Sequence, residues 1–230
     1  MLLYHNSLAK TIENLNEAWF YSKDISKETG DSVSIFLAFL EDKNGSYAGL
    51  PAPTEQDFRN PEKRLFTGEK LRAAAGSAHI LGEEALRAII KLNSSSPEVR
   101  EAIRLSKEGF ECRLKETSEV NGGRMIGMYC CGICTVSYMR NLTIGTFKHS
   151  GQRLEASLKE LKNLRNGSGR WRRFPFHYTI LALSEINHSK AIDEIRYAAS
   201  SLERIANRRV LKDKYAIRRK DLAQRALGII

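Results

Sequence analysis

The chain has 230 residues, a formal net charge of +10 at pH 7 and four cysteines. Hydrophobic residues make up 42% and charged residues 28%, which is ordinary globular usage and excludes a disordered or fibrous protein. A chain of this length buries roughly 70% of its unfolded surface, so it can form a proper core. Since no apolar run approaches the ~18 residues of a membrane span and no signal-peptide pattern opens the chain, we expect a soluble, cytoplasmic protein.

Helical spacing of apolar residues begins close to the N-terminus. Leu8, Ile12, Leu15 and Trp19 follow one another at steps of four, three and four, which predicts an amphipathic helix over residues 7–21. The next apolar run, VSIFLAFL, is apolar on all sides. It predicts a helix that is buried all round.

A long loop is predicted over residues 45–68, where three of the five prolines fall within LPAPTEQDFRNPEKRLF. Thr54 is suited to begin a turn of helix inside it. Loops of this length in compact domains are often functional, so the segment is a candidate lid. The alternative is an ordered loop that packs Phe58, Leu65 and Phe66 onto the domain.

The later segments are predicted to be helices as well. Ser96, Pro97 and Glu98 form the start signal of a helix that runs to about Lys115. Three further stripes have helical spacing: Leu81, Ala85, Leu86, Ile89 and Ile90; Leu154, Leu158, Leu161 and Leu164; and Ile192, Ile195, Ala199, Leu202 and Ala206. No segment alternates convincingly as a strand, so the fold class is all-α.

Turns that contain Asn-Gly recur along the chain as DKNGSYAG, EVNGGRMIGMY and RNGSGRWRRFPF. After the last two, an apolar helix is followed by a more amphipathic one, with a period near 45 residues. Such self-similarity indicates stacked helical hairpins. We therefore expect a single helical-hairpin repeat domain over 1–230, with a loop insertion at about 45–68 and a basic helical segment at about 190–230.

The third turn resembles the hairpin repeats of the terpenoid cyclase and protein prenyltransferase superfamily. Gly169-Arg170-Trp171 stands ahead of Pro175-Phe176 and the helix YTILALSEI, as in that superfamily's glycine-tryptophan turn with its inner helix. The resemblance implies an α/α toroid, or an open arc of one, around a central cavity. It does not carry over the chemistry, because this chain has neither the DxDD acid motif of the cyclases nor a recognisable zinc set of the prenyltransferases.

Three cysteines lie within MIGMYCCGIC. On a helix, Cys130 and Cys134 share a face, and Cys131 and Cys134 form C-x-x-C. Near a helix N-terminus such thiols suit redox chemistry or metal ligation. His79 is a further metal or redox candidate, and Glu83 follows it four residues later. Zinc is possible but not favoured, since a tetrahedral site needs four ligands. The competing interpretation is that the cysteines pack as small hydrophobes in a helix core.

Aromatic and cationic residues cluster around the third turn. Arginine beside aromatic rings can bind phosphates or stack on bases, and histidine can act as an acid or base. The alternative is that the rings pack the turn while the arginines stay in solvent. The candidate cavity residues are Tyr129, Trp171, Arg172, Arg173, Phe176, His177 and Tyr178.

The positive charge is concentrated in the C-terminal segment. From Arg196 onward there are ten Lys and Arg against three Asp and Glu, a local net of +7. A basic helix face is typical either of a solvated surface or of a contact with an anionic partner. The candidate contacts are Arg204, Arg208, Arg209, Arg218, Arg219 and Lys220.

Four functions are compatible with these patterns. The leading one is binding of a small apolar ligand or peptide in a central cavity or concave face. The others are an enzyme like the prenyltransferases or cyclases with a metal near the cysteines, a module that binds nucleic acid or another anion through the C-terminal segment, and a scaffold that forms a homo-oligomer. Whether the chain is an enzyme is left open.

Overall fold

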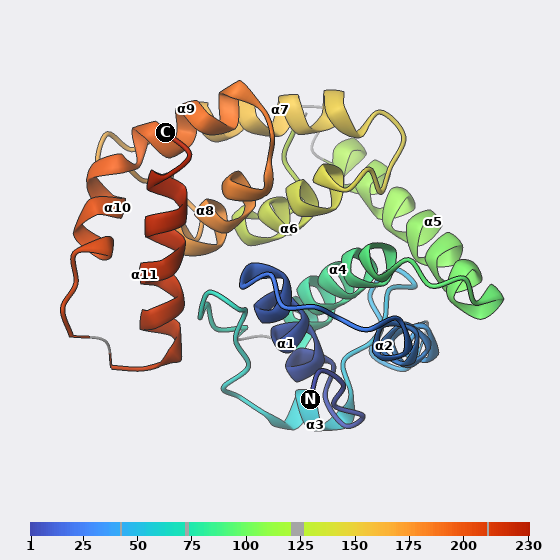
Figure 1. The fold of residues 1–230 in the computed structure, drawn as a ribbon. Helices are drawn as coiled ribbons and strands as arrows, with labels where there is room; N and C mark the ends of the chain where they lie inside the picture. Colours follow the sequence, from blue (N-terminus) through green and yellow to red (C-terminus); the bar gives the residue numbers. More distant parts are fainter. Residues whose placement is uncertain (42, 72–73, 121–126, 211) are drawn as a thin grey trace. The chain divides into compact units, whose positions relative to one another are not determined.

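A computed structural model of the chain describes residues 1–230 except 42, 72–73, 121–126 and 211 (Figure 1). The described residues form eleven helices and no strand, which confirms the all-α prediction. The chain divides into two compact units, which are described separately below: unit 1 comprises residues 1–66 and 70–120, and unit 2 comprises residues 67–69 and 121–230. In the part of the chain described, no helix is both long and apolar enough to cross a membrane.

Unit 1 is built around one central helix. Its helices are α1 (Leu8–Phe20), α2 (Lys27–Phe39), α3 (Glu55–Arg59), α4 (Ala74–Leu92) and α5 (Pro97–Val120). Helices α1, α2 and α5 all pack against α4, and the side chains from Leu81 to Ile89 are buried. The stripe at residues 7–21 therefore forms the predicted helix, since Leu8, Ile12 and Leu15 are buried on it.

The prediction that VSIFLAFL is buried all round is wrong. The segment lies in α2, and Val33 and Leu37 are fully buried, but Ile35 is 54% and Phe39 68% exposed. Because α2 packs mainly against α4 and α5 among the described helices, it buries the side chains of one face. A segment in which nearly every residue is apolar has no hydrophobic periodicity, so the sequence could not show which face of the helix other helices would cover.

Asp57 joins the long loop to the start of α1. Its carboxylate accepts hydrogen bonds from the amide of Leu8 at 2.8 Å and from the amide of Thr54 at 3.0 Å, and the residue is 1% exposed. It thus pairs amides at the first turns of α1 and α3 that have no partner within their helices. The predicted turn of helix after Thr54 is α3. Leu65 and Phe66 are buried, as the packed-loop alternative expects, whereas Phe58 is 38% exposed.

Unit 2 consists of stacked helical hairpins followed by two further helices. Its helices are α6 (Gly132–Thr143), α7 (Ser150–Asn163), α8 (Phe176–Glu185), α9 (Ser189–Tyr197), α10 (Ala199–Ala206) and α11 (Lys214–Leu227). The buried helices α6 and α8 pack on each other, and the amphipathic helices α7 and α9 cover them (Figure 1). Stacked hairpins, each an inner helix followed by an outer one, are therefore confirmed.

Two details of unit 2 differ from a simple repeat. The stripe at residues 192–206 forms two helices, α9 and α10, which are separated at Ala198. At the start of α6, a Cβ on Gly132 would lie 2.0 Å from the carbonyl oxygen of Arg173. Only glycine permits this approach, so α6 begins directly against the turn that precedes α8.

Candidate functional site

The turn that precedes α8 is held by buried contacts. The indole Nε1 of Trp171 donates a hydrogen bond to Glu194 Oε2 at 2.8 Å, and Arg165 Nη2 lies 2.8 Å from Glu194 Oε1. The Trp171 and Phe176 rings stack with their centroids 6.2 Å apart. Because Glu194 belongs to α9, these contacts fix the first residues of α8 against the outer layer.

The aromatic cavity candidates belong to the core. Tyr129 is 0%, Tyr178 1%, Trp171 4% and Phe176 8% exposed. Arg172 and Arg173 are exposed. The structure thus separates a set of residues that the sequence places together: the rings pack the hairpins, and the guanidinium groups lie at the surface.

His177 is the member of this segment on which positive charges converge. It lies in the first turn of α8 and is partly buried. Burial, together with the positive charges of Arg219, Arg170 and Arg208, lowers the pKa of His177 to about 3. The three arginines, called the arginine cluster from here on, come from α11, from the turn before α8 and from the segment after α10. The fold therefore joins two candidates that the sequence treats separately, the aromatic segment and the basic C-terminal segment.

Specific contacts hold each part of the arginine cluster. Arg219 Nε donates to the carbonyl oxygen of Thr67 at 2.7 Å. The Arg170 guanidinium carbon lies 4.8 Å from the centre of the Phe176 ring. Lys220 Nζ donates to the carbonyl oxygen of Arg208 at 3.1 Å, which ties α11 to the segment after α10. The guanidinium group of Arg219 is thus positioned by a backbone carbonyl and that of Arg170 by an aromatic ring, whereas Arg208 is held through its main chain.

One carboxylate lies at the same end of α8. Glu69 Oε1 accepts a hydrogen bond from the amide of Tyr178 at 3.1 Å, and its other oxygen is hydrogen-bonded to the Thr67 hydroxyl. A negative group is favourable at a helix N-terminus. The segment 67–69 therefore supplies both an anion for α8 and the carbonyl that holds Arg219.

The remaining basic candidates differ in exposure. Arg204 and Arg209 are exposed and Lys220 is partly buried. Arg218 is only 4% exposed, and its guanidinium carbon lies 5.6 Å from the centre of the Tyr215 ring. Arg218 thus packs inside unit 2 and does not belong to the exposed basic face.

The lowered pKa of His177 predicts a dependence of stability on pH. The unfolded histidine takes up a proton below its ordinary pKa of 6.5, whereas the folded one stays neutral down to about pH 3. The free energy of unfolding should therefore fall by about 2 kcal/mol between about pH 6.5 and about pH 5 from this group alone. The free energy of unfolding of H177Q, measured by denaturant unfolding, should not show this decrease with pH. The variant H5Q, which replaces an exposed histidine, should show the same decrease as the parent chain. Identical pH profiles for H177Q and the parent chain would contradict the prediction.

The three clustered cysteines surround the start of α6. Cys131 is the N-cap residue, and its Sγ lies 3.0 Å from Sγ of Cys134 one turn into the helix. Cys130 and Cys131 are exposed, and Cys134 is buried. The neighbouring Cys130 thiol is the largest cause of a raised pKa for the Cys131 thiol. The thiols thus form one group, as the C-x-x-C spacing predicts, and only Cys134 packs in the core.

His79 belongs to a buried polar group on α4 in unit 1. Its Nε2 lies 2.5 Å from Oε1 of Glu83, and its ring stacks on Tyr47 with the centroids 4.0 Å apart. On the same helix, Glu84 accepts a hydrogen bond from Asn16 Nδ2 at 3.2 Å. His79 and Glu83 form the pair that their spacing suggests. The link from Asn16 to Glu84 was missed, although a polar residue in the apolar stripe of α1 was a signal for it.

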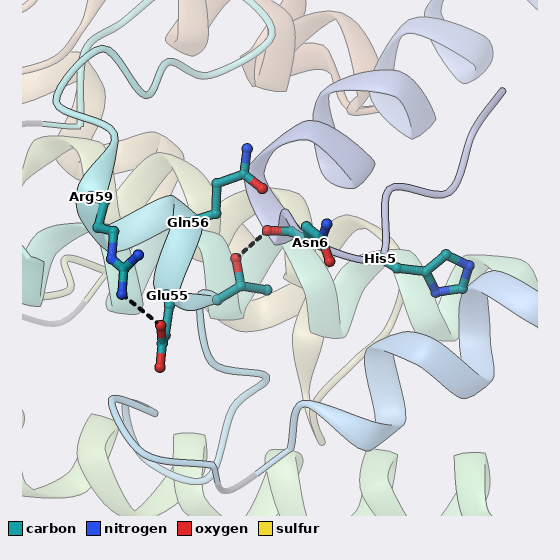
Figure 2. Close-up of a pocket in the computed structure, with 6 residues that line it drawn as sticks. His5, Asn6, Glu55, Gln56 and Arg59 are labelled. Carbon is teal, nitrogen blue, oxygen red and sulfur yellow. Dashed lines mark hydrogen bonds and ion pairs between the residues drawn. The ribbon is translucent and has the colours of Figure 1, made fainter.

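A hollow of about 410 Å³ lies beside α3, lined by His5, Asn6, Thr54, Glu55, Gln56 and Arg59 (Figure 2). Arg59 pairs with Glu55 at 2.9 Å, and both side chains are more than 80% exposed. Such a pair contributes little energy. The hollow is polar and its charges face each other, so it offers no strong determinant for a ligand.

In comparisons with known proteins, no family model, no curated protein and no solved structure matches this chain. The fold and the site define its class by geometry alone: an all-α protein with stacked helical hairpins, an arginine cluster and a thiol cluster.

Proposed function

We propose that this chain is a nucleic-acid-binding protein and that the arginine cluster in unit 2 contacts the phosphate backbone. The observation that carries the proposal is that Arg170 lies over the Phe176 ring, which contacts the His177 ring, and that the positive charges of Arg170, Arg208 and Arg219 all act on His177. Guanidinium groups make paired, charge-assisted hydrogen bonds with phosphate oxygens. A bound phosphate would also offset the positive charge that the three arginines place around His177.

The surrounding surface supports an extended anionic ligand. Arg172, Arg173, Arg204 and Arg209 are exposed on the same unit, and clustered exposed basic residues are the electrostatic footprint of nucleic-acid binding. A cytoplasmic location would suit such a ligand. A small phosphate-bearing molecule would use the cluster but would have no need of the further arginines.

The other functions stay predictions with less support. Binding of a small apolar ligand or peptide in a central cavity was based on Trp171, Phe176 and Tyr178, and these rings are packed in the core. The resemblance to prenyltransferases and cyclases, the toroid and a homo-oligomer likewise stay predictions.

The proposal predicts binding that depends steeply on salt. Contacts from three arginines to a single strand give a slope of about −2 in log K against log[salt]. Fluorescence anisotropy with a labelled single-stranded oligonucleotide should therefore show affinity falling about 20-fold between 50 mM and 200 mM salt. No binding at the lower salt concentration would contradict the proposal. Equal competition by inorganic polyphosphate would also contradict it, because the site would then be a general anion site.

A further inference from the structure

We propose that Cys130, Cys131 and Cys134 form a thiolate site for one thiophilic metal ion, Zn²⁺ or Cu⁺. The proposal is independent of nucleic-acid binding, because it concerns a different group of residues at the start of a different helix, α6.

The distances between the three sulfurs fit a common ion. Cys131 Sγ and Cys134 Sγ lie 3.0 Å apart, and Cys130 Sγ lies within 4.8 Å of Cys134 Sγ. The Cys130 thiol is also in hydrogen-bond contact with the Cys131 thiol. Since Zn–S bonds are about 2.3 Å long, two thiolates on one ion can lie up to about 4.6 Å apart. Small side-chain rotations would therefore bring all three sulfurs to bonding distance.

The start of α6 lies beside the three thiols. Cys131 is its N-cap residue, and the positive end of the helix dipole stabilises a nearby negative charge, which opposes the raising of the Cys131 thiol pKa by the neighbouring Cys130 thiol. Cys130 and Cys131 are exposed while Cys134 is buried. An ion can thus reach the two exposed sulfurs from solvent and also bind the buried sulfur of Cys134.

The third thiol distinguishes a metal site from a redox pair. A disulfide would use only Cys131 and Cys134, and Cys130 would then have no part in the chemistry. Thiolate ligands select soft ions such as Zn²⁺ and Cu⁺. On binding, each sulfur forms a bond to the ion and releases its proton to solvent, so affinity should rise with pH. Zn²⁺ would complete its coordination with a water molecule, whereas Cu⁺ accepts fewer ligands.

The test is native mass spectrometry of the full chain, reduced and kept without oxygen, after addition of one equivalent of Zn²⁺ or of Cu⁺ in separate samples. We expect one bound ion per chain in at least one sample, and the comparison identifies the preferred ion. With Co²⁺ as a substitute for zinc, a sulfur-to-metal charge-transfer band in the absorption spectrum should appear. A reduced chain that takes up neither ion overturns the proposal.

Cysteine variants assign the ligands. Competition with a chromophoric chelator should show affinity reduced at least about 10-fold in each of C130S, C131S and C134S. The matched control is C112S, because Cys112 is exposed on α5 in unit 1, and its affinity should equal that of the parent chain. Equal affinity in all four variants would place the ion elsewhere and overturn the proposal. If a serine variant folds poorly, the charge-transfer band in the Co²⁺ spectrum of the parent chain still tests whether thiolates bind the ion.

Discussion

Replacing Arg170, Arg208 and Arg219 together with glutamine should weaken binding of a single-stranded oligonucleotide by about 100-fold at low salt. Each arginine contributes charge-assisted hydrogen bonds to phosphate. Removal of three phosphate contacts should also reduce the magnitude of the slope of log K against log[salt] by about 2. Fluorescence anisotropy over a series of salt concentrations measures both effects. Circular dichroism of the variant should show that the helices of unit 2 are retained.

A charge-matched control tests whether position matters. The variant R59Q/R100Q/R104Q removes the same charge from exposed positions of unit 1. It should change affinity only slightly, because these arginines are not among the proposed phosphate contacts and two of them, Arg59 and Arg104, are paired with carboxylates. Equal weakening by the two triple variants would mean that net charge, rather than the arginine cluster, is responsible. If loss of the Arg219–Thr67 hydrogen bond unfolds the first variant, R170Q/R208Q gives the same test without it.

The R140A variant should lose about 3–5 kcal/mol of the free energy of unfolding of unit 2. Arg140 on α6 is 2% exposed, and its Nε and Nη2 each donate to a different oxygen of Glu185 on α8 at 2.8 Å. Its guanidinium carbon also lies 5.6 Å from the centre of the Tyr178 ring. Truncation would leave a cavity between the inner helices and remove both hydrogen bonds that Arg140 donates to Glu185, which together are strongly destabilising.

Denaturant unfolding followed by circular dichroism measures this loss. R140M should be less destabilising than R140A, because the longer side chain fills much of the same volume between α6 and α8. R104A, which breaks an exposed pair with Glu101 on α5, should cost less than about 1 kcal/mol. An R140A variant as stable as R104A would show that the Arg140–Glu185 pair does not hold the inner helices together.

The local patterns were sufficient for most elements of the fold. Helices α1, α5 and α7 follow stripes or start signals that depend only on nearby residues, and the repeated turns predicted that inner and outer helices alternate. The prediction was wrong for burial along α2, where Ile35 and Phe39 are exposed, and it merged α9 with α10 across Ala198. In both cases the outcome depends on which neighbouring helix covers a face, and short-range periodicity does not contain that information.

The sites were predicted unequally for the same reason. The C-x-x-C spacing was enough to bring Cys131 and Cys134 together, because both lie within one turn of a single helix. The electrostatic effect of Arg208 and Arg219 on His177 was not predicted, since these residues come from separate elements of unit 2. Asn16 and Glu84 were likewise not paired, because they lie 68 positions apart on two helices.

By itself, the sequence determined the helical class, the alternation of inner and outer helices, the thiol spacing and the positive charge of the C-terminal segment, because all of these depend on composition and on short-range spacing. Only the tertiary structure decided that Trp171 and Phe176 are core, that Arg218 is buried, and that the positive charges of Arg170, Arg208 and Arg219 act on His177. The physical reason is that burial and electrostatic coupling depend on distances in space, and packing between helices sets those distances.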